Sequence, residues 1–399
     1  MKRRHFLMAG GLFGAGLYIN QRGLRYPRFS FEPANPATGL TTEQTQLDLN
    51  DFIITQQSDS GVISLRAIAP EPSLIFTPKN DTSSNTKLEI NNVSPNAVLK
   101  AEADPSAAIH ETVNGINRSV ELTHKTNQVI KLTWILNNPE TVTFAAIGDS
   151  GGGVELDWCL TRAQQLDVDF MLHLGDFHYG EGEYERAIDQ FKNAPMPIYV
   201  SIGNHDFNDS GLIYQQFLDH IGPMNNSFVI SGTRFINVDT AVNFFPAYSG
   251  NRGSLMRQLI NQDQPVTDHV IFTHKPFIDS RGGDYSHDIS GIGEKPWLEK
   301  TMQQLGATDL LCGHVHHSAE NDYQGIRQWT TGEGLGHEDL VHKKLVSKIL
   351  VGSLNPQQKV NYQWHDLAMP WQMHQSHTHE KKLRDYNRME QLEWYQNLF

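Results

Sequence analysis

The sequence has little cysteine, little positive charge and no long apolar run, and each shortage excludes a class of protein. Two cysteines in 399 residues, Cys159 and Cys312, make no disulfide framework. Both lie in apolar runs, so we expect buried free thiols rather than a bridge. Lys and Arg number 32 against 45 Asp and Glu, a formal net charge of −13. A nucleic-acid binder needs a basic surface to release counterions, so polymeric DNA or RNA is not an expected partner.

The N-terminus carries a short apolar stretch behind a pair of arginines. Lys2-Arg3-Arg4-His5-Phe6-Leu7 is a twin-arginine pattern, and a Gly-rich apolar segment follows to about Ile19. That segment is too short for a transmembrane span, and we interpret residues 1–28 as a twin-arginine signal peptide with the start of a linker. We therefore expect the twin-arginine export machinery as a partner and a periplasmic or cell-envelope location. No sharp cleavage site follows, so membrane anchoring by an uncleaved N-terminus stays open, as does a chance arginine pair.

Residues 45–138 predict a small all-β domain. Apolar and polar residues alternate, as at Ile130, Leu132 and Trp134, and turn sequences such as Asn114-Gly115 separate the runs. Short strands at this spacing are typical of an antiparallel sandwich of the immunoglobulin or fibronectin III kind. This region contains no catalytic constellation.

Residues 140–366 change to apolar strands that alternate with amphipathic helices, which predicts a layered α/β domain. The predicted strands are 142–147, 169–174, 198–202, 235–238, 269–273 and 309–312. The predicted helices are centred on 156–166, 184–191, 212–218 and 297–305. The remaining segment, 367–399, is a polar, His-rich tail that is predicted to end in a helix.

Polar side chains of metal-binding types follow these strands in order along the chain. They lie in five blocks: Gly148-Asp149-Ser150-Gly151-Gly152, Gly175-Asp176-Phe177-His178-Tyr179, Gly203-Asn204-His205-Asp206, Val270-Ile271-Phe272-Thr273-His274 and Gly313-His314-Val315-His316. Carboxylate, phenol, amide and imidazole are the ligands that a pair of hard-to-borderline metals needs. Because open α/β sheets place their ligands at the carboxyl ends of strands, we expect the blocks to meet in one site.

A pair of cations roughly 3.5–4 Å apart suits the chemistry of phosphate esters. The oxyanions of the ester repel a nucleophile, and two cations neutralise them, lower the pKa of a bound water and stabilise the leaving oxygen. Such a site needs a carboxylate to bridge the cations. Phenolate and carboxylate suit a trivalent ion, whereas imidazole and amide oxygen suit a divalent one.

The five blocks together resemble the binuclear, calcineurin-like metallophosphoesterase superfamily over about Val142 to Asp366. The resemblance implies a layered β-sandwich core flanked by helices. It implies a first metal, Fe(III), with the ligands Asp149, Tyr179 and His316. It implies a second metal, Fe(II), Zn(II) or Mn(II), with the ligands Asn204, His274 and His314. Asp176 would bridge the two metals, which would supply the positive charge of the site without help from Arg or Lys.

The block that ends in Tyr179 narrows the resemblance to the purple acid phosphatase branch. Other branches place a His two residues after the first Asp, where this chain has Gly151, and Tyr179 replaces that lost ligand. The Gly-Asp-x-Gly-Gly and Gly-Asn-His-Asp sequences are similar to the small, tartrate-resistant type, whereas an N-terminal sandwich is similar to the large plant type. The resemblance implies hydrolysis of phosphomonoesters by a metal-bound hydroxide, with His205 protonating the leaving group. Asp206 could orient the other ring nitrogen of His205 and raise its pKa.

Three more histidines adjoin the blocks and are candidates for contact with substrate or with the ligands: His178, His287 and His317. Two other functions stay open at this point. One is a phosphodiesterase or nucleotide hydrolase on the same site, because loop shape selects the ester class. The other is a cell-envelope binding protein with a decayed site, whose sandwich is the functional part.

Overall fold

The structure is a computed structural model of the chain. It describes residues 39–41, 45–57, 62–79, 84–125, 128–137, 140–208, 213–241, 250–262, 265–282, 287–291, 293–336 and 347–370. The predicted signal segment and the predicted helix of the tail lie outside these residues. Within them, no helix is long and apolar enough to cross a membrane.

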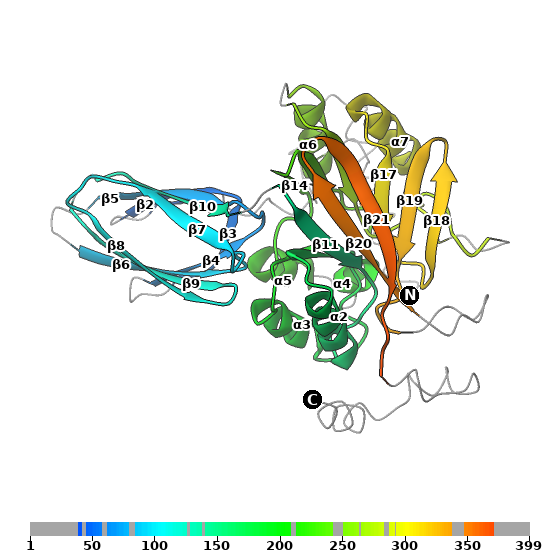
Figure 1. The fold of residues 1–399 in the computed structure, drawn as a ribbon, viewed down its shortest axis with the longest axis horizontal. Helices are drawn as coiled ribbons and strands as arrows, with labels where there is room; N and C mark the ends of the chain where they lie inside the picture. The colour runs from blue at the N-terminus through cyan, green and yellow to red at the C-terminus, as the bar shows by residue number, and fades with distance from the viewer. Residues whose placement is uncertain are drawn as a thin grey trace, which may run out of the picture. The chain divides into compact units, whose positions relative to one another are not determined.

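The N-terminal strands form two five-stranded sheets (Figure 1). One sheet has the order β1-β2-β5-β10-β7, with strands Gly39–Thr41, Thr45–Asn50, Ser73–Pro78, Ile130–Leu136 and Ala97–Glu102. The other has the order β3-β4-β6-β9-β8, with strands Phe52–Gln57, Val62–Ala67, Ser84–Asn91, Asn117–His124 and Ala108–Asn114. The pair β4 and β6 is parallel, so the sandwich is not wholly antiparallel as expected.

Alternation of apolar and polar residues builds the core of this sandwich. In β10, every second residue is buried, and Ile130, Leu132 and Trp134 are fully enclosed. The Trp134 ring packs edge-on against Phe52 of the opposite sheet, with 5.7 Å between ring centroids. Side chains of a strand point alternately to its two faces, so this pattern buries one face and leaves the other to solvent.

Two further mixed sheets form the second domain. The first has the order β13-β12-β11-β20-β21, with strands Ile198–Val200, Phe170–His173, Val142–Ile147, Lys348–Asn355 and Gln358–Asp366. The second has the order β14-β15-β16-β17-β19-β18, with strands Asn226–Ile230, Thr233–Asn237, Asp268–Phe272, Asp309–Cys312, Ile326–Thr331 and Ser318–Tyr323. The central strands β11 to β13 are parallel to one another, and so are β15, β16, β17 and β19.

Aromatic side chains fill the space between these two sheets. Phe144 of β11 and Phe170 of β12 each contact Phe235 of β15, at centroid distances of 5.1 and 5.7 Å. Large rings at offset or edge-on angles bury much apolar area, so this layer is the core of the domain.

Helices cover the outer face of each sheet. On the first sheet, buried side chains of α2 (Val154–Gln165), α3 (Glu183–Lys192) and α5 (Ile213–His220) join residues such as Ile147 and Met171 in one cluster. On the second, α6 (Gly250–Ile260) and α7 (Glu294–Leu305) pack on residues such as Ile236 and Ile271. A short helix, α4, spans Asn204–Asn208. The predicted α/β class with a preceding all-β domain is confirmed, and Cys159 and Cys312 are buried free thiols as expected.

Buried side chains of the sandwich bind backbone groups of the second domain. The Asn92 side chain accepts from the N–H of Ile198 at 2.8 Å and donates to its carbonyl at 3.1 Å. Arg66 donates to the same carbonyl and to that of Ile221, both at 3.1 Å. Ile198 begins the edge strand β13, so polar groups that would otherwise be left open at a sheet edge are satisfied here.

Candidate metal centre

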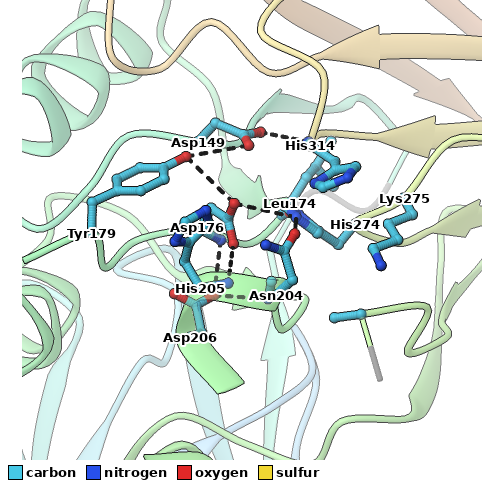
Figure 2. A network of polar contacts seen from close by, with 12 residues as sticks. Asp149, Leu174, Asp176, Tyr179, Asn204, His205, Asp206, His274, Lys275 and His314 are labelled. Atoms are coloured by element: carbon cyan, nitrogen blue, oxygen red, sulfur yellow. Dashed lines mark hydrogen bonds and ion pairs between the residues drawn. The ribbon is translucent and has the colours of Figure 1, made fainter. Parts of the chain in front are cut away.

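The sequence blocks lie where the parallel strands end. Asp149 follows β11, Asp176 and Tyr179 follow β12, and Asn204 opens α4 after β13. In the other sheet, the two parallel strands β16 and β17 are followed by the remaining blocks, with ligand candidates His274, His314 and His316. The carboxyl ends of parallel strands share one edge of a sheet, and the structure brings all seven predicted ligands to one region. Figure 2 labels Asp149, Asp176, Tyr179, Asn204, His274 and His314 among them.

Three of these residues have backbone conformations that are uncommon for side chains with a Cβ. The φ angles are 61° at Asp149, 56° at Asp176 and 67° at His314. Such strain costs on the order of 1–3 kcal/mol per residue and persists where the surrounding structure enforces it, which is often a functional site. At Gly203 a Cβ would lie 2.1 Å from Oδ1 of Asp176, so glycine is required there for the two loops to approach.

The phenol oxygen of Tyr179 is the centre of one half of the site. It lies 3.4 Å from Oδ1 of Asp149 and 3.4 Å from Oδ2 of Asp176 (Figure 2). It also lies 3.3 Å from Nε2 of His316. Two ligand atoms that bind one ion at about 2.1 Å lie roughly 3.0–3.4 Å apart at octahedral or tetrahedral angles. The spacing of these four side chains therefore fits the edges of a metal coordination shell.

The imidazole of His274 is the centre of the other half. Its Nε2 lies 2.9 Å from Oδ1 of Asn204 and 3.4 Å from Oδ2 of Asp176. The ligand atoms of Asp176, His274 and His314 all lie within 4.8 Å of one another. Nδ1 of His274 contacts the carbonyl of Leu174 at 2.8 Å, and a carbonyl only accepts. The proton therefore stays on Nδ1, and the lone pair of Nε2 faces the site.

One oxygen of Asp176 belongs to both halves. Oδ2 lies 3.4 Å from the phenol oxygen of Tyr179 and 3.4 Å from Nε2 of His274, whereas Oδ1 accepts the backbone N–H of His205 at 2.9 Å. This arrangement is the one that a bridging carboxylate requires.

Electrostatics of the buried site favour a cation. Burial and the Asp176 carboxylate raise the pKa of Asp149 well above its usual value. Burial also raises the pKa of Asp176, but without a metal the His274 and His205 imidazoles, in their protonated form, outweigh burial and hold that pKa below its ordinary value. Burial and the two carboxylates raise the pKa of the Tyr179 phenol. Enclosed carboxylates gain stability from a bound metal, which also enforces deprotonation of the phenol.

The imidazole of His314 is held in the form that binds metals. Burial, with the neighbouring His274, lowers its pKa to about 2. Its backbone N–H donates to Oδ2 of Asp149 at 2.8 Å, which ties the last block to the first. A neutral imidazole next to carboxylate, amide and phenol oxygens is a donor set for transition metals, so the residues present fit a pair of ions.

His205 lies at the mouth of the site rather than among the ligands. Its side chain is exposed, and its ring lies over Tyr179 with 4.7 Å between centroids. The expected contact of Asp206 with this ring is wrong. Asp206 is fully buried, and its carboxylate accepts the backbone N–H groups of Asp176, Phe177 and Gly203 at 2.7–3.0 Å. Asp206 therefore holds the loop of Asp176 in place.

The three additional histidines lie in different surroundings. His178 is buried, and its Nδ1 contacts the backbone carbonyl of His205 at 3.2 Å. Its ring therefore supports the backbone of the loop that carries His205. His287 is half-exposed, and its ring lies 5.7 Å from that of His314, at the edge of the site. His317 is buried, and its backbone N–H donates to the carbonyl of Val315.

Two charged residues near the ligands were missed by the sequence reasoning. Lys275 is buried beside His274 (Figure 2). Burial lowers the pKa of Lys275, while the carboxylates of Glu294, Asp239 and Asp176 act to raise it. The sequence reasoning expected no Arg or Lys in the site, whereas the structure places the Lys275 amine beside it. Glu183 is fully buried and accepts the backbone N–H of Tyr179. Neither residue belongs to one of the five sequence blocks, although Lys275 directly follows His274 and Glu183 lies four residues after Tyr179.

Comparisons with known proteins found a family match and several similar solved structures. Residues 142–318 match the model of the family described as calcineurin-like phosphoesterase. A comparison with curated proteins found no match. Solved structures similar to this chain include a purple acid phosphatase from yellow lupin (Lupinus luteus) seeds, at 13% identity and a TM-score of 0.48, covering 75% of this chain and 70% of that one.

Two other similar structures come from animals and parasites. One is a dimetal phosphatase from Danio rerio, at 12% identity and a TM-score of 0.38, covering 57% of this chain and 96% of that one. Another is the anchor GAP50 of the inner membrane complex of Plasmodium, at 16% identity and a TM-score of 0.42, covering 57% and 85%. The family match covers all seven candidate ligands, so residues 142–318 are similar to the calcineurin-like phosphoesterase family.

Proposed function

We propose that the chain is a binuclear-metal phosphatase of the purple acid phosphatase type, with phosphomonoesters as substrates. One observation carries the proposal: the phenol oxygen of Tyr179 lies within 3.4 Å of donor atoms of Asp149, Asp176 and His316. Phenolate and carboxylate favour a hard trivalent ion, so Fe(III) is the proposed first metal.

The other half of the site would hold the second metal, with Asp176 bridging. Asn204, His274 and His314 offer an amide oxygen and two imidazoles, which suit Fe(II), Zn(II) or Mn(II). When bound, the two cations neutralise the ester oxyanions, lower the pKa of a water and stabilise the leaving oxygen.

The chain itself supplies orientation and protons. Asp206 fixes the Asp176 loop, and Leu174 fixes the tautomer of His274. His205 is exposed above the ligands with its backbone tied to Asp176, so its ring can hold a proton for the leaving alkoxide. Lys275 is buried beside the second half of the site, where its side chain would attract an anionic ester when protonated.

Metal analysis together with a panel of phosphate esters tests this proposal. We expect two transition-metal ions per chain, loss of turnover on their removal, and faster turnover of monoesters than of matched diesters. Preference for diesters would replace the proposal with a phosphodiesterase or nucleotide hydrolase on the same site. Two bound metals without turnover of any ester would support a binding protein with a decayed site.

A further inference from the structure

Glu183 forms hydrogen bonds with the backbone of the loop that carries Tyr179. It lies four residues after Tyr179, at the start of α3, and none of its surface is exposed. Its Oε2 accepts the backbone N–H of Tyr179 at 2.6 Å and that of Gly180 at 3.2 Å. Its own N–H donates to the carbonyl of Gly180 at 3.2 Å. Three hydrogen bonds thus close the segment from the ligand to the helix.

The loop of the first ligand also packs directly on Glu183. A Cβ on Gly152 would lie 2.1 Å from the carbonyl oxygen of Glu183, so only glycine allows this approach. A Cβ on Gly151 would lie 3.4 Å from Oε2 of Glu183 and 3.4 Å from Cδ2 of Tyr179. One buried residue therefore contacts both the loop that carries Asp149 and the loop that carries Tyr179.

We propose that Glu183 is a positioning residue for the first metal, which aims the phenol of Tyr179 at the space beside Asp149. This rests on the proposed function, in which Tyr179 binds Fe(III). A ligand site works only when its side chains are held to within about 0.5 Å by the groups around them. Removing such a support typically weakens metal binding or activity by roughly 10- to 100-fold.

Glu185 provides the matched control. It lies in the same first turn of α3 and contributes the same negative charge near the helix N-terminus, but its side chain is exposed. A general effect on the helix should therefore be similar for the two residues. A change in the orientation of the Tyr179 phenol is expected only when Glu183 is replaced.

The experiment compares full-length wild type, Glu183→Ala, Glu183→Asp, Glu183→Gln and Glu185→Ala. Each protein is loaded with iron and oxidised, and the iron affinity and the visible phenolate-to-iron band are recorded beside the melting temperature. We expect roughly 10- to 100-fold weaker iron binding, with a shifted or weakened band, in Glu183→Ala. Glu183→Asp withdraws the oxygen by one methylene and should behave similarly while it stays folded. Glu183→Gln keeps an acceptor and should recover most of the wild-type signal, and Glu185→Ala should match wild type.

The outcomes separate this inference from the proposed function. A coloured wild type whose band and iron affinity do not change in Glu183→Ala or Glu183→Asp would overturn the positioning role and leave Tyr179 as a ligand. Equal spectral losses in Glu183→Asp and Glu185→Ala would show that Glu183 only stabilises the helix, which would also overturn the positioning role. A colourless wild type with iron confirmed in the site would instead contradict the proposed function itself.

Discussion

The ring of Tyr179 lies against Gly151, where a Cβ would stand 3.4 Å from Cδ2 of the ring. Gly151 has a φ of 62°, a conformation that glycine adopts at no steric cost. The position that bears a His in related branches therefore gives room to the phenol. In the proposed function, Tyr179 takes the place of that His as a ligand, and the packing of its ring on Gly151 is compatible with this exchange.

Asp176→Asn should abolish activity and weaken both metals. Oδ2 of Asp176 lies 3.4 Å from donor atoms of both halves of the site, and an amide supplies no negative oxygen for two cations. Metal content by elemental analysis and turnover of a monoester check this together. Near-wild-type turnover with both metals bound would exclude the bridging role.

His205→Ala should keep both metals but lower turnover by roughly 10²–10⁴, which is the usual share of general acid catalysis. The loss should shrink for esters with good leaving groups, because these need less protonation. Turnover across a series of leaving groups is the measurement, with His110→Ala, an exposed His of the sandwich, as the control. A loss that is equal across the series would assign His205 to substrate binding.

Asn92→Gly should destabilise the protein although it lies far from any ligand in sequence. The Asn92 side chain makes three buried hydrogen bonds, to Ala67 and to both backbone groups of Ile198. Unpaired buried backbone groups cost about 1–3 kcal/mol. Asn92 has a φ of 69°, so glycine removes the amide without adding strain.

Denaturant unfolding compares this variant with Asn96→Gly, an exposed neighbour that carries the same entropy cost of a new glycine. Equal free energies of unfolding in the two variants would show that the sandwich contributes nothing to the edge strand. A larger loss in Asn92→Gly is the expected result.

Replacement of Arg3 and Arg4 by Lys should retain the protein in the cytoplasm. The prediction rests on the twin-arginine pattern alone, which is a receptor-read address. Fractionation of cells that express each form checks it, with Lys2→Arg as a charge-matched control. Equal export of both forms would exclude the twin-arginine route.

The buried strands formed by continuous apolar runs were predicted most accurately from the sequence. The strands Val142–Ile147 and Asp309–Cys312 agree with the predicted bounds, because buried parallel strands are apolar on both faces. Two polar edge strands were missed. β18 (Ser318–Tyr323) and β21 (Gln358–Asp366) are largely polar, and edge strands expose much of their surface.

The candidate ligands were predictable because each follows a strand and carries a distinctive donor. The residues that hold these candidate ligands in place could not be predicted from the sequence. Asp206 is next to His205 in sequence, but its carboxylate binds backbone amides of the loop after β12. The contact of Glu183 with Gly152 likewise joins segments that only the fold brings together. Sequence spacing names side chains of the right chemistry, whereas their partners depend on the tertiary structure.

The visible spectrum of the iron-loaded, oxidised protein before and after Tyr179→Phe tests the central claim most directly. A phenolate bound to Fe(III) gives a charge-transfer band, and binding requires deprotonation far below the free phenol's pKa of about 10. Tyr179→Phe removes one oxygen and leaves the ring in place against Gly151 and His205. The account predicts a violet or purple wild type and a folded mutant that lacks the band. An unchanged band in the mutant, or a colourless wild type with iron confirmed at the first site, would contradict it.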